Sequence, residues 1–120
     1  MIERLKQASS ERTGGALEGI TVIELCGARG HFMGKLMGDM GARVIKVEPL
    51  GGALERQIGP FMHDQPHPDR SLFFWAHNTS KESLEINLET AEGQEIIKRL
   101  VKSADVLLED FEPGYLSSVG

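Results

Sequence analysis

Short apolar runs alternate with helically spaced apolar residues along most of the chain. Residues 20–25 and 43–48 are β-branched runs bounded by glycine or proline, which is typical of buried strands. Between them, apolar side chains recur at three- and four-residue spacing, which predicts a helix whose apolar stripe is Phe32, Met33, Leu36, Met37 and Met40. Strand, glycine turn, helix and strand follow one another as in a βαβ unit, whose crossover is right-handed.

Three glycines interrupt this predicted helix, at Gly34, Gly38 and Gly41. Each weakens an isolated helix by about 1 kcal/mol relative to alanine. We therefore expect close packing of the helix against a neighbour, or a C-terminal cap in the case of Gly41.

The second half of the chain repeats the same order. Residues 83–88 alternate polar and apolar, which predicts a strand with one solvated face. Thr90 can cap a helix that runs to about Ser103, and residues 104–109 predict a third buried strand. This order predicts the α/β class, with a Rossmann-like open parallel sheet flanked by helices.

The remaining segments show neither the helical spacing nor the alternation typical of strands. We expect residues 1–17 to be a flexible lead-in with a short helix near residues 2–7, and residues 18–120 to form one N-terminal α/β domain. Residues 49–68 carry four of the five prolines and predict a long irregular loop, which is usually functional or disordered. The aromatic run at 73–75 is expected to be buried, and residues 117–120 look like the start of another helix or turn.

Composition and charge exclude several classes of protein. With 120 residues, 40% of them apolar and 26% charged, the chain suits one globular domain. A net charge of −5 without a basic cluster argues against nucleic-acid binding, and the absence of an apolar run of membrane-spanning length argues against a membrane partner. The lone Cys26 and an N-terminus without a signal-peptide core predict a cytoplasmic protein.

Ligands of open parallel sheets collect outside the carboxyl ends of the strands. The predicted ends carry Cys26–Gly30, Glu48–Gly52 and Glu109–Gly114. Gly27 and Gly30 precede a helix N-terminus, which favours an anion such as phosphate, and Arg29 would add a positive charge. The alternative is that the glycines serve the turn's backbone and that Arg29 is solvated.

Other chemistries have weaker support. The spacing Gly27-x-x-Gly30-x-x-x-Gly34, with Glu48 as a ribose-binding acid, is an imperfect dinucleotide fingerprint, so a nucleotide-binding oxidoreductase is a minor alternative. The four histidines lack partners at ligand spacing, which predicts no metal site. Cys26 is more typical of a small buried residue than of a nucleophile, and the acidic turn at 109–112 is more typical of a solvated surface than of catalytic bases.

The order of these motifs resembles the opening of the family III CoA-transferases, the CaiB/BaiF group. The resemblance covers about residues 18–120 and rests on seven segments in the family's order: Gly19–Leu25, Met40–Pro49 with Gly51 and Gly52, Leu72–Phe74, Asn78-x-x-Lys81, Ser83–Leu88, Thr90–Gly93 and Ala104–Gly114.

The resemblance implies an enzyme that moves CoA between an acyl-CoA and a small carboxylic acid, or a racemase of the same family. CoA would be a thioester substrate rather than a tightly bound cofactor. The family's nucleophilic aspartate would lie beyond Gly120, so no residue here inherits a catalytic role and the chain alone is expected to be inactive. A non-catalytic truncated relative or partner subunit is the alternative, and the family's interlocked dimers imply a homodimer or a partner subunit.

The resemblance also implies which residues contact CoA. They are Ala28, Arg29, Pro49, Ile86, Asn87, Leu88, Glu89, Asp110, Phe111 and Glu112. Several positions depart from the family's pattern: the first loop is one residue shorter, Pro49 stands for an arginine, Asp110 for an asparagine and Glu82 for an arginine. Because three of these changes remove positive charge or amide donors, we expect weak CoA binding that depends on Arg29 and the Gly27–Gly30 turn.

Overall fold

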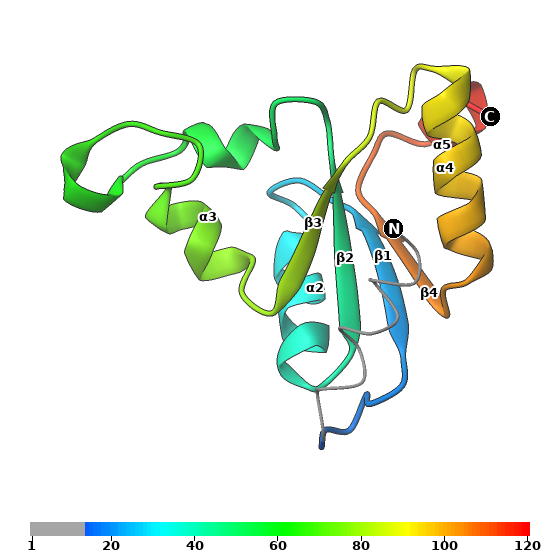
Figure 1. Cartoon of the computed structure of the whole chain (residues 1–120), viewed down its shortest axis with the longest axis horizontal. Helices are drawn as coiled ribbons and strands as arrows, with labels where there is room; N and C mark the ends of the chain where they lie inside the picture. The colour runs from blue at the N-terminus through cyan, green and yellow to red at the C-terminus, as the bar shows by residue number, and fades with distance from the viewer. Residues whose placement is uncertain (1–13) are drawn as a thin grey trace.

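The computed structural model describes residues 14–120, and a four-stranded parallel sheet runs through their centre (Figure 1). Its strands lie in the order β3-β2-β1-β4 and comprise β1 (Thr21–Leu25), β2 (Arg43–Glu48), β3 (Lys81–Glu85) and β4 (Val106–Glu109). In the register of the central strands, Ile23 lies between Ile45 and Leu107. The α/β class and the parallel sheet predicted from the sequence are confirmed.

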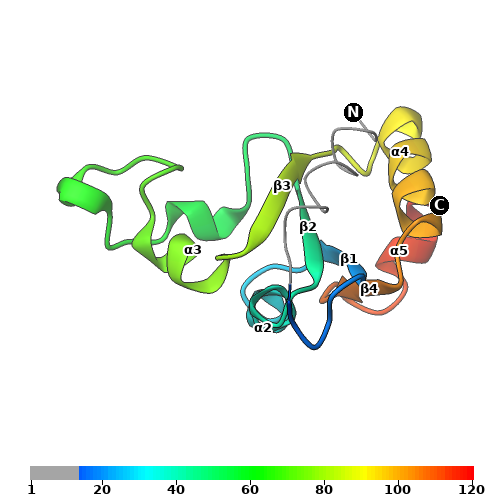
Figure 2. The ribbon, with the colours of Figure 1, turned by 60° about the horizontal axis from the view of Figure 1, so that its bottom comes forward.

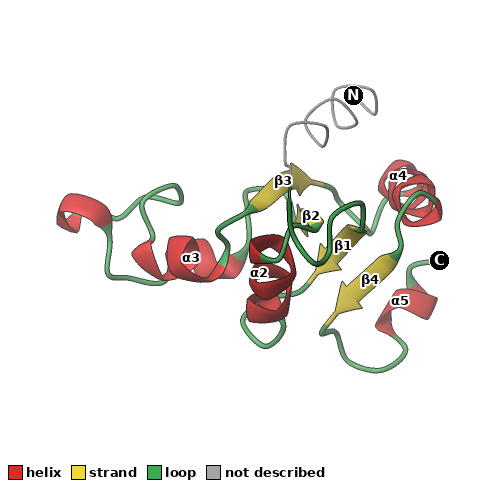
Figure 3. Cartoon of the chain, turned by 90° about the horizontal axis from the view of Figure 1, so that it is seen from below, coloured by secondary structure: helices red, strands yellow, loops and turns green. Residues whose placement is uncertain are grey.

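Helices cover the two faces of the sheet, as Figures 2 and 3 show. The helix α2 (His31–Asp39) connects β1 to β2, and α4 (Ala91–Lys102) connects β3 to β4. Beneath α4, Leu100 packs with Ile23, Leu25, Ile45, Val47 and Ile86. On the α2 face, Met37 packs against Val22, Ala42 and Val44. The predicted cap of α4 is confirmed, because the Thr90 hydroxyl accepts a hydrogen bond from the Gly93 amide at 3.1 Å.

The helix α2 approaches the sheet most closely through its glycines. Gly34 and Gly38 are buried, whereas Phe32 and Met33 are 51% and 53% exposed. A Cβ on Gly34 would overlap the buried carboxylate of Glu24 in β1. The expected close packing of these glycines is therefore confirmed. Of the predicted apolar stripe only Met37 packs on the sheet, and the other four residues are exposed.

Two strands differ from their predicted positions. The strand β3 begins two residues early, at Lys81, because it pairs with β2 from Val44 to Glu48, and residues 86–88 leave the sheet. The strand β4 is an edge strand, so it is not fully buried as predicted, and Leu107 remains 40% exposed.

The segment between β2 and β3 extends beyond the sheet edge (Figure 1). It holds two short 3₁₀ helices, η2 (Leu54–Gln57) and η3 (Met62–Asp64), and then the helix α3 (Leu72–His77). The aromatic run thus lies in a helix that buries Phe74 but leaves Trp75 42% exposed, against the expectation of full burial.

The two ends of the described chain add short segments to the fold. The helix α5 (Tyr115–Ser118) follows β4, so a further helix is present, but it begins before residues 117–120, where the sequence suggested its start. The Leu17 amide donates to the Met40 carbonyl at 2.9 Å, so the end of the predicted lead-in packs beside α2. The helix predicted near residues 2–7 lies outside the described residues. Among residues 14–120, no helix has the length and apolar character needed to cross a membrane.

Candidate functional site

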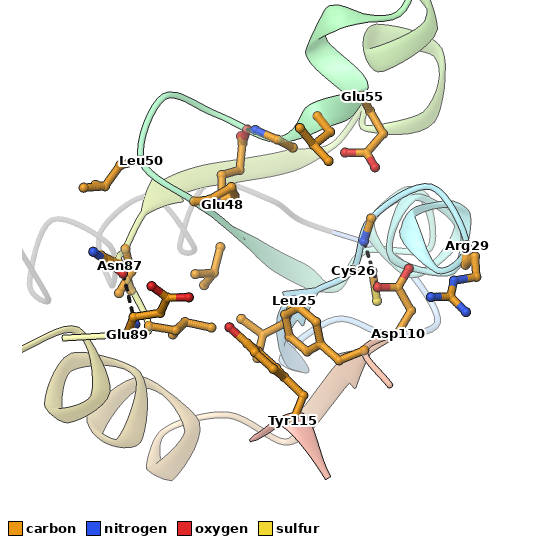
Figure 4. Close-up of a pocket in the computed structure, with 18 of the residues that line it drawn as sticks. Leu25, Cys26, Arg29, Glu48, Leu50, Glu55, Asn87, Glu89, Asp110 and Tyr115 are labelled. Carbon is orange, nitrogen blue, oxygen red and sulfur yellow. Dashed lines mark hydrogen bonds between the residues drawn. The ribbon is translucent and has the colours of Figure 1, made fainter. Parts of the chain in front are cut away.

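A pocket of about 680 Å³ opens at the carboxyl ends of the strands (Figure 4). The end of β1, the loops after β2 and β3, the 3₁₀ helix η2 and the turn after β4 all contribute to its lining. This is the place where open parallel sheets bind ligands. Its volume is typical of small-molecule sites.

Nine of the ten residues singled out from the sequence lie together in this pocket. They are Arg29, Pro49, Ile86, Asn87, Leu88, Glu89, Asp110, Phe111 and Glu112. The tenth, Ala28, is exposed in the turn after β1 and does not line the pocket.

The strand ends singled out from the sequence also contribute Cys26, Gly27, Glu48 and Leu50 to the lining. Sequence reasoning missed the remaining lining residues, which are Leu25, Val47, Ala53, Leu54, Glu55 and Tyr115. Leu25 and Val47 directly precede those strand ends. No local pattern marks the other four, because they reach the pocket only through the tertiary fold of the segments that follow the strands.

The turn after β1 is already bound by a carboxylate of the chain. Asp110 accepts hydrogen bonds from the Gly27 amide at 3.0 Å and from the Gly30 amide at 2.9 Å. The hypothesis that these amides receive a phosphate is therefore wrong for this arrangement. Arg29 still adds a cation at the rim, where it pairs with Glu112 at 3.3 Å and both side chains are largely exposed.

Glu48 holds η2 against the sheet. Its buried carboxylate binds the Arg56 guanidinium in a bidentate pair, at 2.6 Å to Nε and 2.7 Å to Nη2. Ser83 and the Ala53 amide donate the remaining hydrogen bonds, and Arg56 also stacks over the Phe74 ring at 3.9 Å. Burial alone would raise the pKa of Glu48, but these donors outweigh it and lower the pKa to about 2. Because both oxygens are bound, Glu48 is not free for a ribose, which removes the main support for the dinucleotide alternative.

A second buried ionic cluster holds the turn between β1 and α2 in place. Glu24 in β1 pairs with Lys46 at 2.9 Å and with Lys81 at 2.7 Å, and all three side chains are almost fully buried. The two ammonium groups also donate to backbone carbonyls at either side of the turn, Lys46 to Cys26 and Lys81 to His31, each at 2.6 Å. Burial lowers the pKa of Lys81, which the Glu24 carboxylate partly offsets.

The thiol of Cys26 is not prepared for nucleophilic attack. Burial, and then the charges of Glu24 and Asp110, raise its pKa to about 12. Its Sγ packs so closely on Gly30 that a Cβ there would approach it to 2.6 Å. The thiolate form that a nucleophile requires is therefore disfavoured, in agreement with the expectation of a small buried residue.

The buried His31 predicts a pH dependence of stability. Burial, and then His77, which stacks on it at 4.6 Å, lower the pKa of His31 from 6.5 to about 4. The unfolded chain thus binds a proton at pH values where the folded chain does not, so stability falls as the pH drops from 6.5 to 4. Glu48 acts in the same direction only below pH 4.5, since its pKa falls from 4.5 to about 2.

We expect the urea midpoint of the chain to fall between pH 7 and pH 5, and His31→Phe to flatten this decline while keeping the stacked ring. Parallel declines of the two proteins across this window would contradict the assignment to His31.

Comparison with known proteins decides the family. The sequence model of CoA-transferase family III matches residues 17–120. This chain belongs to that family. Among its relatives, the family III member named succinyl-CoA–D-citramalate CoA-transferase of Chloroflexus aurantiacus is 42% identical over 115 residues, which cover 93% of this chain and 27% of that protein. The BbsE subunit of the succinyl-CoA:(R)-benzylsuccinate CoA-transferase of Thauera aromatica is 34% identical over 99 residues, 82% of this chain and 24% of the subunit.

Solved structures of the family agree with the fold. A CaiB/BaiF family protein from Brucella suis superposes with a TM-score of 0.78 at 33% identity, over 89% of this chain and 29% of that one. The chain therefore spans about a quarter of the length of the curated relatives it matches. Among residues 14–120, no group of three or more His, Cys, Asp or Glu side chains is arranged to hold a metal ion.

Proposed function

We propose that this chain is the CoA-binding part of a family III CoA-transferase, which moves CoA between an acyl-CoA and a carboxylic acid. The observation that carries the proposal is the convergence of Arg29, Pro49, Ile86–Glu89 and Asp110–Glu112 in one pocket. These residues come from four separate segments, and the family resemblance implies a CoA contact for each of them.

The lining divides into parts that suit different portions of CoA. Leu25, Val47, Ile86, Leu88 and Phe111 provide apolar surface for the adenine and the pantetheine chain. Arg29, the one cation among the lining residues of the described chain, is the partner for a phosphate if Glu112 releases it. The neighbouring carboxylates of Glu89, Asp110 and Glu112 oppose an anionic ligand, so we expect weak affinity.

Among the described pocket residues, the Cys26 thiol stays protonated and is therefore not prepared to attack a thioester carbonyl. We therefore propose that turnover needs the carboxylate nucleophile that the family places outside this segment, and that CoA is a transient substrate. The acidic rim and the kinship with a named transferase subunit support a second candidate, a non-catalytic partner subunit with the same fold.

Assembly and location follow from the same proposal. The exposed apolar residues of α2 and the exposed edge strand β4 support a homodimer or a complex with a partner subunit. A cytoplasmic enzyme is in keeping with the single buried Cys26.

Isothermal calorimetry with CoA and with NAD⁺ tests the proposal. We expect saturable binding of CoA alone, and we expect Arg29→Ala to weaken it by about 1.5–3 kcal/mol, the range for a hydrogen bond to a charged group. Arg99→Ala is the matched control, because Arg99 lies on α4, is exposed and does not line the pocket. Equal CoA affinity of the wild type and Arg29→Ala would remove Arg29 from the site, and preferential binding of NAD⁺ would overturn the proposed function.

A further inference from the structure

One of the buried residues of the pocket carries a carboxylate that accepts no hydrogen bond from the described part of the chain. Glu55, on η2, is 7% exposed and lines the pocket, and its carboxylate accepts no hydrogen bond from any group within residues 14–120. Figure 4 shows this carboxylate directed into the pocket, toward Cys26. Glu48 is buried to a similar degree but is bound by Arg56, Ser83 and Ala53.

The fold holds Glu55 in this position. Its backbone carbonyl accepts a hydrogen bond from the Ser71 hydroxyl at 3.2 Å, and the next residue, Arg56, is clamped by Glu48. The carboxylate lies against Gly27 in the turn after β1, where a Cβ would lie 2.9 Å from Glu55 Oε1, so the glycine leaves room for it. A ligand that supplies a donor to this unpaired carboxylate gains a charge-assisted hydrogen bond.

The position of Glu55 identifies the part of the ligand that it meets. Cys26, Ala53 and Glu55 are each less than 8% exposed and form one buried part of the pocket, whereas Leu50 and Leu54 are 65% and 81% exposed and belong to the open rim. Phosphates are strongly hydrated and favour the rim, so the acyl group of a thioester is the portion that fits the buried end.

We propose that Glu55 determines the acyl specificity of this pocket by accepting a hydrogen bond from a hydroxyl or amine group on the acyl chain and by repelling acyl groups that end in a second carboxylate. The inference rests on the proposed CoA binding and adds the class of acyl group. Two anionic carboxylates brought together in a confined pocket repel each other. A hydroxyl or ammonium group instead satisfies the unpaired oxygens of Glu55.

The test compares two four-carbon thioesters, 3-hydroxybutyryl-CoA and succinyl-CoA, with free CoA as reference, by calorimetry on the full chain. We expect the wild type to bind 3-hydroxybutyryl-CoA about tenfold or more tightly than succinyl-CoA. Glu55→Gln keeps the shape but removes the charge, so it should reduce the ratio to about threefold or less, chiefly by tighter binding of succinyl-CoA. Glu92→Gln on the exposed start of α4 makes the same charge change outside the pocket and should leave the ratio unchanged.

The two levels of the proposal fail in different ways. Binding of free CoA with an unchanged thioester ratio in Glu55→Gln overturns the role of Glu55 alone. A wild type that prefers succinyl-CoA overturns it as well, without need of any variant. Loss of binding of CoA and both thioesters in the wild type overturns the proposed function and this inference together.

Discussion

Replacing Arg56 with alanine is expected to destabilise the chain by about 3–5 kcal/mol, because it leaves the fully buried Glu48 carboxylate without its charged partner. The same change removes the ring contact with Phe74 and so loosens η2, which carries the pocket residues Leu54 and Glu55. Urea unfolding at pH 7 measures the loss.

Two further variants show whether the stability lost in Arg56→Ala comes from the buried ion pair. Arg99→Ala removes an exposed helical arginine and should cost less than about 1 kcal/mol. Combining Arg56→Met with Glu48→Leu removes both charges and should recover much of the stability lost in Arg56→Ala, since apolar replacement of a buried pair is often neutral. A loss below about 1 kcal/mol in Arg56→Ala would contradict the buried bidentate pair.

Gly34→Ala should also be strongly destabilising, by about 3 kcal/mol or more. Its Cβ would overlap the Glu24 carboxylate, which cannot shift easily because Lys46 and Lys81 hold it from two sides. The sign makes this test sharp, because alanine in a solvent-facing helix position stabilises by about 1 kcal/mol relative to glycine.

Gly38→Ala is the graded comparison on the same face of α2. Its Cβ would lie 2.9 Å from the Ser80 carbonyl oxygen, so we expect a smaller loss than for Gly34. Unfolding free energies of the two variants and the wild type check the order. A gain in stability for Gly34→Ala would show that α2 does not approach the sheet so closely.

The sequence predicted those parts of the fold that depend on local signals. The β-branched run at 20–25, the Thr90 cap and the helix that follows it depend on signals within a few residues, and each appears in the structure as expected. The buried face of α2 could not be predicted this way. Its apolar period pointed to Phe32 and Met33, but the ionic cluster beneath the helix, assembled from three strands, favours the glycine face instead.

The residues of the site also differ in whether the sequence could predict them. Motif order placed Asn87 and Phe111 in the pocket, since the family resemblance carries information about distant segments. Two features of the site could not be predicted in this way: Asp110 accepts hydrogen bonds from the Gly27 and Gly30 amides, and Glu55 lies against Gly27. Both depend on tertiary contacts between segments that are far apart in the sequence.

A titration of the isotope-labelled chain with CoA, followed through its backbone amide NMR signals, tests most directly whether this pocket binds CoA. The structure leads us to expect saturable shifts concentrated at Leu50, Asn87, Glu89 and Phe111, with small changes on the exposed face of α4. Saturable shifts confined to residues outside the pocket, or no shifts at millimolar CoA, would contradict the assignment.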